Sequence, residues 1–132
     1  MIEEYIYTKV TQDPALQALL TDGVGGYNIY PGVIPRGVES FNVAVSFSLI
    51  TTRDVYPVSK SVNVQFNIFS SEHIKTAQTA KALNDLFNED NLQTVGDLKM
   101  VYSQRISESD LGKTLDNDAL YQREATYYFK LR

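Results

Sequence analysis

The chain has 132 residues, no cysteine and a formal net charge of −4 at neutral pH. A chain of this length is typical of one domain, with roughly two-thirds of its unfolded surface buried in a single core. Without cysteine there is no disulfide or thiolate chemistry, and the acidic balance disfavours a nucleic-acid-binding protein. No apolar run is long enough for a transmembrane helix, and the acidic first residues do not form a signal peptide.

A pair of short helices is predicted over residues 2–21. Apolar side chains recur every three or four positions over residues 2–11, which is typical of an amphipathic helix. Asp13 and Pro14 then provide an N-cap followed by proline at the first helical position. The leucines that follow predict a second helix over residues 14–21, and a glycine-rich turn ends it.

A short strand over residues 27–30 and an irregular arm over residues 31–40 follow the helical pair. The arm contains two prolines and two glycines, so its backbone cannot form a regular ladder. Two strands with period-two alternation then predict an antiparallel hairpin over residues 41–69. Its first strand covers residues 41–51, and the connection runs through residues 52–57.

The hairpin leads directly into a helix predicted over residues 71–88. Ser70 and Ser71 are N-cap candidates, and Glu72 lies where the positive end of a helix favours an acid. The apolar side of this helix can fold back over the apolar face of the preceding strand. The predicted core contains Phe47, Val64, Phe66, Ile68, Leu83 and Phe87.

The last third of the chain predicts two more strands, over residues 97–107 and 119–131. A polar break at residues 88–91 precedes them, and a polar loop over residues 107–118 joins them. In the final strand, alternate positions from Tyr121 to Leu131 form one face and the polar residues form the other.

These elements predict a single α+β domain over residues 1–132. Its antiparallel sheet would have about four long strands plus a short one, with the helices packed on one face. The polar strand faces contain serine, asparagine, glutamine and threonine rather than lysine and glutamate, so they can pack on another subunit without burying charge. Oligomerisation would also protect the edges of the long strands.

The sequence predicts no catalytic, cofactor or metal site. His73 is the sole histidine, which excludes a multi-histidine metal site, and its place in the first helical turn is typical of a boundary residue. Gly112-Lys113-Thr114 imitates the end of a phosphate-binding loop, but Ser107 occupies the position of the required first glycine. The loop acids lack the spacing of a calcium loop. The chain is therefore not expected to be an enzyme.

A succession of short motifs resembles a known protein family. Residues 27–31 read YNIYP, residues 64–70 read VQFNIFS, and residues 76–83 read TAQTAKAL, with the proline-containing arm and the hairpin between the first two. This order resembles the small tail-terminator proteins of long-tailed bacteriophages, also called tail-completion or head–tail joining proteins. The likeness covers residues 2 to about 88. The arm departs from the family, in which a proline–aromatic pair opens the next strand.

The resemblance implies a structural virion protein of the tail or neck, made in the cytoplasm of the bacterial host. Such proteins form a hexameric ring on the head-proximal end of the tail tube, stop its polymerisation and offer a surface to the head connector. The implied partners are other copies of the chain, the tail tube protein and the head connector or neck protein. DNA would only pass through the lumen without specific binding, and no membrane or cofactor is implied.

Two groups of residues are candidates for contacts in such a ring. The hairpin tip and the arm contain residue types common at interfaces, and the loop over residues 107–118 is acidic enough to repel passing DNA. The interface candidates are Arg53, Tyr56, Pro31 and Arg36. The lumen candidates are Glu108, Asp110, Asp116 and Asp118.

Two alternative functions fit the same sequence. One is another phage neck, head-completion or tail ring protein with a similar role. The other is a cytoplasmic α+β domain that binds a small molecule. A pocket lined by convergent polar groups would favour the small-molecule function, whereas a ring with a wide lumen would favour either virion role.

Overall fold

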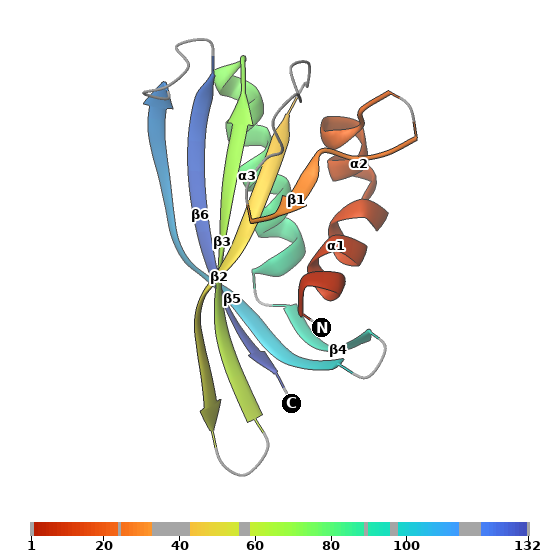
Figure 1. Cartoon of the computed structure of the whole chain (residues 1–132), viewed down its shortest axis with the longest axis vertical. Coiled ribbons are helices and arrows are strands. Elements are labelled where there is room, and N and C mark those ends of the chain that lie inside the picture. Colours follow the sequence, from red (N-terminus) through yellow and green to blue (C-terminus); the bar gives the residue numbers. More distant parts are fainter. Residues whose placement is uncertain are drawn as a thin grey trace.

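The computed structural model describes residues 2–23, 25–32, 43–55, 59–88, 90–95, 98–113 and 120–131. Within these residues, three helices lie on one face of a six-stranded sheet, which confirms the predicted α+β class (Figure 1). None of the described helices is long and apolar enough to cross a membrane. The helices are α1 (Ile2–Gln12), α2 (Pro14–Leu20) and α3 (His73–Phe87). The strands are β1 (Ile29–Pro31), β2 (Ala44–Val55), β3 (Ser59–Ser70), β4 (Asp90–Val95), β5 (Leu98–Lys113) and β6 (Tyr121–Leu131).

The strand order in the sheet is β1-β2-β3-β6-β5-β4. All neighbouring strands are antiparallel except β1 and β2, which run parallel with Ile29 beside Val45. The predicted hairpin is present, and β2 continues to Val55, so the connection is shorter than predicted. The far end of this hairpin extends beyond the helical layer (Figure 1). Most of the predicted arm, residues 33–40, lies outside the described residues.

Two strand predictions are wrong. No strand was predicted at β4, because its polar sequence has no clear alternation. It forms by pairing with β5. The predicted loop over residues 107–118 begins as strand, because β5 continues to Lys113 and pairs with β6 along this length. Register shifts after Arg105 and after Asp110 interrupt the period-two pattern there. A polar sequence with broken periodicity therefore reads as a loop although its backbone is paired.

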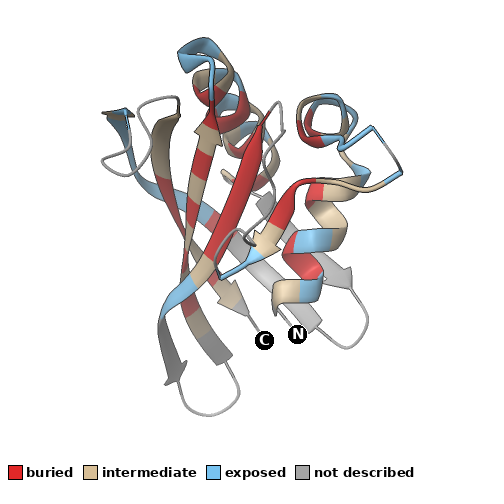
Figure 2. Ribbon diagram, turned by 45° about the horizontal axis from the view of Figure 1, so that its top comes forward, coloured by how far each residue is buried: buried red, intermediate tan, exposed pale blue. Residues whose placement is uncertain are grey.

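The core lies between the sheet and the helices (Figure 2). Phe66 is fully buried in it. The ring centroid of Phe66 lies 6.0 Å from that of Phe47, 5.6 Å from that of Phe87 and 5.8 Å from that of Tyr127. All six residues predicted for the core are buried. The alternation in β3 and the helical periodicity of α3 thus identified the two surfaces that pack together.

The helix ends follow the predicted chemistry at one position and not at another. Asp13 caps α2, since its Oδ2 accepts a hydrogen bond of 3.1 Å from the Leu16 amide. For α3 the predicted serine cap is wrong, because the N-cap is Glu72 and its side chain makes no capping hydrogen bond. Ser70 ends β3 instead, and its hydroxyl accepts from the Glu72 amide at 3.1 Å. That contact fixes the turn from strand to helix.

Candidate functional site

The sheet face opposite the helices carries mainly uncharged polar side chains. Asn63, Gln65 and Asn67 of β3 lie on it, since the residues between them are buried under the helices. In the neighbouring strand, Gln122 donates a hydrogen bond of 3.3 Å from its Nε2 to Oδ1 of Asn67. No described helix covers this face (Figure 1). It offers hydrogen-bond donors and acceptors with few charges, Glu124 and Lys130 of β6 among them, so another protein surface can cover most of it without burying ions.

Each edge of the sheet is only half occupied. β1 pairs with residues 45–47 of β2, and β4 pairs with residues 98–103 of β5. Among the described strands, none pairs with the outer edge of residues 48–55 or of residues 104–113. One amide in the second segment, that of Arg105, donates to the Asn88 side chain at 3.0 Å. Open strand edges of this kind are sites where another chain can add a strand.

Both open segments contain a bulge with an exposed aliphatic residue. In β2 the register shifts between Leu49 and Thr51, and Ile50 between them is 53% exposed. In β5 the shift between Arg105 and Ser107 leaves Ile106 55% exposed. Bulges and charges normally protect strand edges from pairing. Here the bulged residues are apolar, so both edges keep a hydrophobic group in contact with solvent.

The burial along β2 also corrects one sequence assignment. Alternation places Leu49 on the same covered face as Val45 and Phe47, and its register partner is Val64. Leu49 is nevertheless exposed, whereas Ala44 and Ser46 are buried although alternation puts them on the polar face.

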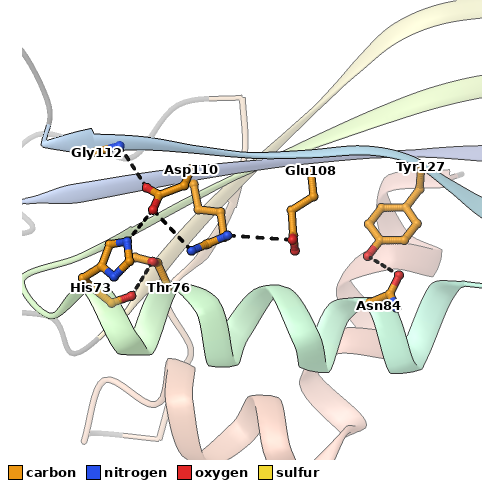
Figure 3. A network of polar contacts seen from close by, with 8 residues as sticks. His73, Thr76, Asn84, Glu108, Asp110, Gly112 and Tyr127 are labelled. Carbon is orange, nitrogen blue, oxygen red and sulfur yellow. Dashed lines mark hydrogen bonds and ion pairs between the residues drawn. The ribbon is translucent and has the colours of Figure 1, made fainter.

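A cluster of ionisable side chains joins the first turn of α3 to β5 and β6 (Figure 3). The Asp110 carboxylate contacts the His73 ring through one oxygen and accepts from the Gly112 amide at 3.0 Å through the other. Arg123 lies between two acids, with one terminal nitrogen 3.5 Å from Asp110 and the other 3.8 Å from Glu108. The cluster therefore places two acids against the Arg123 guanidinium and the His73 ring, and it links the helical layer to the sheet.

The electrostatics of the cluster hold Asp110 in its ionised form. The hydrogen bond with His73, the Gly112 amide and the charge of Arg123 hold the pKa of Asp110 below its ordinary value of 3.8. The Arg123 side chain is only 14% exposed, and its Nε has no partner among the described atoms. Because the two acids contact Arg123 and His73, the cluster holds the start of α3 against the sheet.

We expect Asp110→Asn to reduce the loss of stability at acid pH. A folded-state pKa below the unfolded value means that the contribution of Asp110 is present above pH 3.8 and is lost as the pH falls through the lowered pKa. Urea unfolding at pH 7 and pH 3 should therefore give a smaller difference in free energy for the variant than for the wild type. Asp85→Asn, which breaks an exposed pair with Lys81 on α3, is the matched control. An unchanged difference in Asp110→Asn would contradict the assignment.

Among the described residues, two grooves open on the helical side of the protein. In the first, of about 350 Å³, Asp13 caps α2 and Lys81 pairs with Asp85 at 3.0 Å, so these polar groups already have partners. The second, of about 250 Å³, lies beside α1. Across the described residues, no group of three or more histidine, aspartate or glutamate side chains converges as a metal site. The first groove is lined by Asp13, Ala15, Leu19, Gln78, Lys81, Ala82 and Asp85. The second is lined by Glu3, Glu4, Tyr7, Thr8, Pro31 and Phe47.

The candidates predicted from sequence fall in several places. Pro31 is exposed at the end of β1 and lines the second groove. Arg53 lies in β2, and its side chain is outside the described residues. Glu108 and Asp110 are not in a loop, because they lie in β5 and contact Arg123. The remaining candidates, Tyr56, Arg36, Asp116 and Asp118, lie outside the described residues.

Sequence reasoning missed Arg123 and the two bulged isoleucines. Arg123 occupies a position on the apolar face of the last strand, and a charge at such a position signals a buried partner. Ile50 and Ile106 carry no comparable signal, because only the register shifts place them at the edges.

No known protein family matches this sequence, and neither does any curated protein. Among solved structures, a chain from the virion of a native gene transfer agent particle has a similar fold, with a TM-score of 0.68 and 14% sequence identity. The match covers 96% of this chain and 90% of that chain. At this identity the likeness shows a shared fold.

Proposed function

We propose that this chain is a structural protein of a phage-like particle, where it forms a ring on the head-proximal end of the tail tube. The observation that carries the proposal is a fold shared almost end to end with a chain of a gene transfer agent virion. The motifs over residues 27–31, 64–70 and 76–83, which resemble those of tail-terminator proteins, support the same role. The ring would stop tube polymerisation and give the head connector a surface to bind.

The surfaces of the subunit suit such a cap. A ring needs head-to-tail interfaces, in which two different surfaces of the same chain meet. The two half-open edges lie on opposite sides of the sheet and could supply these surfaces. The uncharged polar face can bind the tube or the connector without burying ions. In a hexamer the subunits would thus contact each other through edges and contact other virion proteins through faces.

Fewer residues than predicted are candidates for an acidic surface that faces the lumen and repels DNA. Glu108 and Asp110 bind Arg123 and His73, so they are poor candidates for repelling DNA. Asp116 and Asp118 remain candidates for a lumen-facing acidic surface. Passing DNA would find no basic surface among these residues and would not be held.

This function is non-enzymatic. In the strongest candidate for acid–base chemistry, the pair of His73 and Asp110, the carboxylate already binds Arg123 and the Gly112 amide. The small-molecule alternative is disfavoured by the first groove, where Asp13, Lys81 and Asp85 already have partners within the protein.

Deletion of the gene in the particle that encodes it tests the proposal. We expect heads to fill normally while tails grow beyond their usual length or fail to join heads, and a plasmid copy of the gene should restore both. Electron microscopy of lysates measures tail length and attachment. Unattached tails of normal length are expected from a terminator and from a neck or head-completion protein alike, so overlong tails are the result that separates the two. Tails of normal length joined to heads would contradict the terminator role.

A further inference from the structure

We propose that neighbouring copies of this chain join edge to edge, with the β5–β4 edge of one copy fitting the β1–β2 edge of the next. The inference rests on the proposed ring and specifies the surfaces that close it. It depends on three properties of the sheet. These are the positions of the short strands along the strand axis, the direction of the edge strands, and the position of the exposed isoleucines.

The register of the sheet places the two short strands at opposite ends. β1 lies beside residues 45–47 of β2, which are level with residues 123–125 of β6. β4 lies beside residues 98–103 of β5, which are level with β6 from residue 129 onward. Each short strand therefore covers one end of its edge and leaves the other end open.

The open segment of each edge lies at the same position along the strand axis as the short strand on the opposite edge. The open part of β5, residues 104–113, is level with residues 121–128 of β6, and this span includes the height of β1. The open part of β2, residues 48–55, begins level with residue 126 of β6 and extends past the start of β4. When two copies are related by rotation about an axis along the strands, β1 of one fills the gap beside β5 of the other. In the same arrangement, β4 of the second copy fills the gap beside β2 of the first.

Strand direction permits both contacts. β5, β6, β3 and β2 are successively antiparallel, so β5 runs opposite to β2 and to its parallel neighbour β1. The contact between β5 and β1 of the next copy is therefore antiparallel. β4 runs in the same direction as β2, which makes the second contact parallel. Both arrangements occur in mixed sheets.

The exposed isoleucines lie where the open segment of β5 faces the open segment of β2 in the next copy. Ile106 lies at the register shift level with residues 126 and 127 of β6, and Ile50 at the shift level with residues 127 and 128. At this position along the strands β1 has ended and β4 has not begun, so β5 of one copy faces β2 of the next across the width of one strand. Each isoleucine is more than half exposed in the single chain, and contact between the two would remove both from water.

These properties identify a second copy as the partner. An unrelated protein could add a strand to either edge, but it would not explain why both edges of one chain match in height and direction. A contact between two different edges of the same chain is head-to-tail, and such contacts form a ring when the rotation between copies closes.

Cysteine cross-linking tests the interface directly, because the chain has no native cysteine. Protein carrying Ile50→Cys and Ile106→Cys, assembled in purified particles, is treated with a short bis-maleimide and run on a denaturing gel. We expect a ladder of covalent multimers in steps of one chain. A mixture of the two single variants should stop at dimers, since each copy then holds one cysteine. The matched control pairs Ile50→Cys with Ile74→Cys, because Ile74 is also exposed but lies on α3.

A second measurement covers variants that assemble too weakly to cross-link. Ile50→Asp and Ile106→Lys should each reduce incorporation into particles at least tenfold without changing the urea midpoint, and the double variant should recover incorporation through the new ion pair. Multimers in native mass spectrometry without the specific ladder or this rescue would overturn the edge interface and leave the ring function intact. Particles that contain only single, separated copies of the chain would overturn both.

Discussion

Replacing Phe66 by alanine is expected to lower the free energy of unfolding by about 3–5 kcal/mol. Phe66 is fully buried at the centre of β3, and its ring lies within 6.0 Å of the ring centroids of Phe47, Phe87 and Tyr127. These three rings come from a neighbouring strand, α3 and β6, so none can collapse into the space without moving its own element. The variant should therefore keep a cavity, which adds to the lost hydrophobic transfer energy.

The neighbouring residue provides the control. Gln65 lies on the opposite face of the same strand, and Gln65→Ala should change the free energy of unfolding by about 0.5 kcal/mol or less. Urea unfolding of both variants, followed by circular dichroism, gives the comparison. An equal loss in the two variants would mean that the faces of β3 are assigned in reverse.

The central part of the fold could be predicted from sequence because local patterns decide it. In β3 the even positions from Val62 to Ile68 are apolar, and the structure buries them. The Asp13-Pro14 pair predicted the start of α2, where the aspartate side chain accepts from the Leu16 amide. Such signals need no information from the rest of the chain.

The rest depended on contacts between distant segments. β4 forms because β5 offers it a partner, and the second half of β5 forms because β6 does. Three register shifts interrupt β5, and one of them falls at Ile106, which is exposed although it continues the alternate positions of Leu98 and Met100. No local rule gives the position of a bulge or the identity of a neighbouring strand.

The candidate site was still less predictable, because it consists of edges rather than motifs. Interface residues were chosen from sequence by type, as for Arg53 and Pro31. The proposed edge contact instead follows from strand order and from the positions of Ile50 and Ile106. The acids Glu108 and Asp110 were misplaced for the same reason, since only the register between β5 and β6 brings them to Arg123.

Replacing Tyr5 by alanine is the second change expected to have a large effect, with a loss of about 3 kcal/mol in the free energy of unfolding. Tyr5 is fully buried on α1, and its ring packs edge-on against Phe129 of β6, with the centroids 6.4 Å apart. Removing this ring weakens the packing of α1 on the sheet, which Ile6 and Val10 also support. The same urea unfolding experiment measures the loss.

Tyr7 is the matched control, because it has the same side chain on the same helix but is exposed. Tyr7→Ala should change the free energy of unfolding by about 0.5 kcal/mol or less. Wild-type stability in Tyr5→Ala would mean that α1 does not pack on this sheet face. One layer of the core would then be missing, and the apolar side chains of β6 under α1 would be open for contact with a partner.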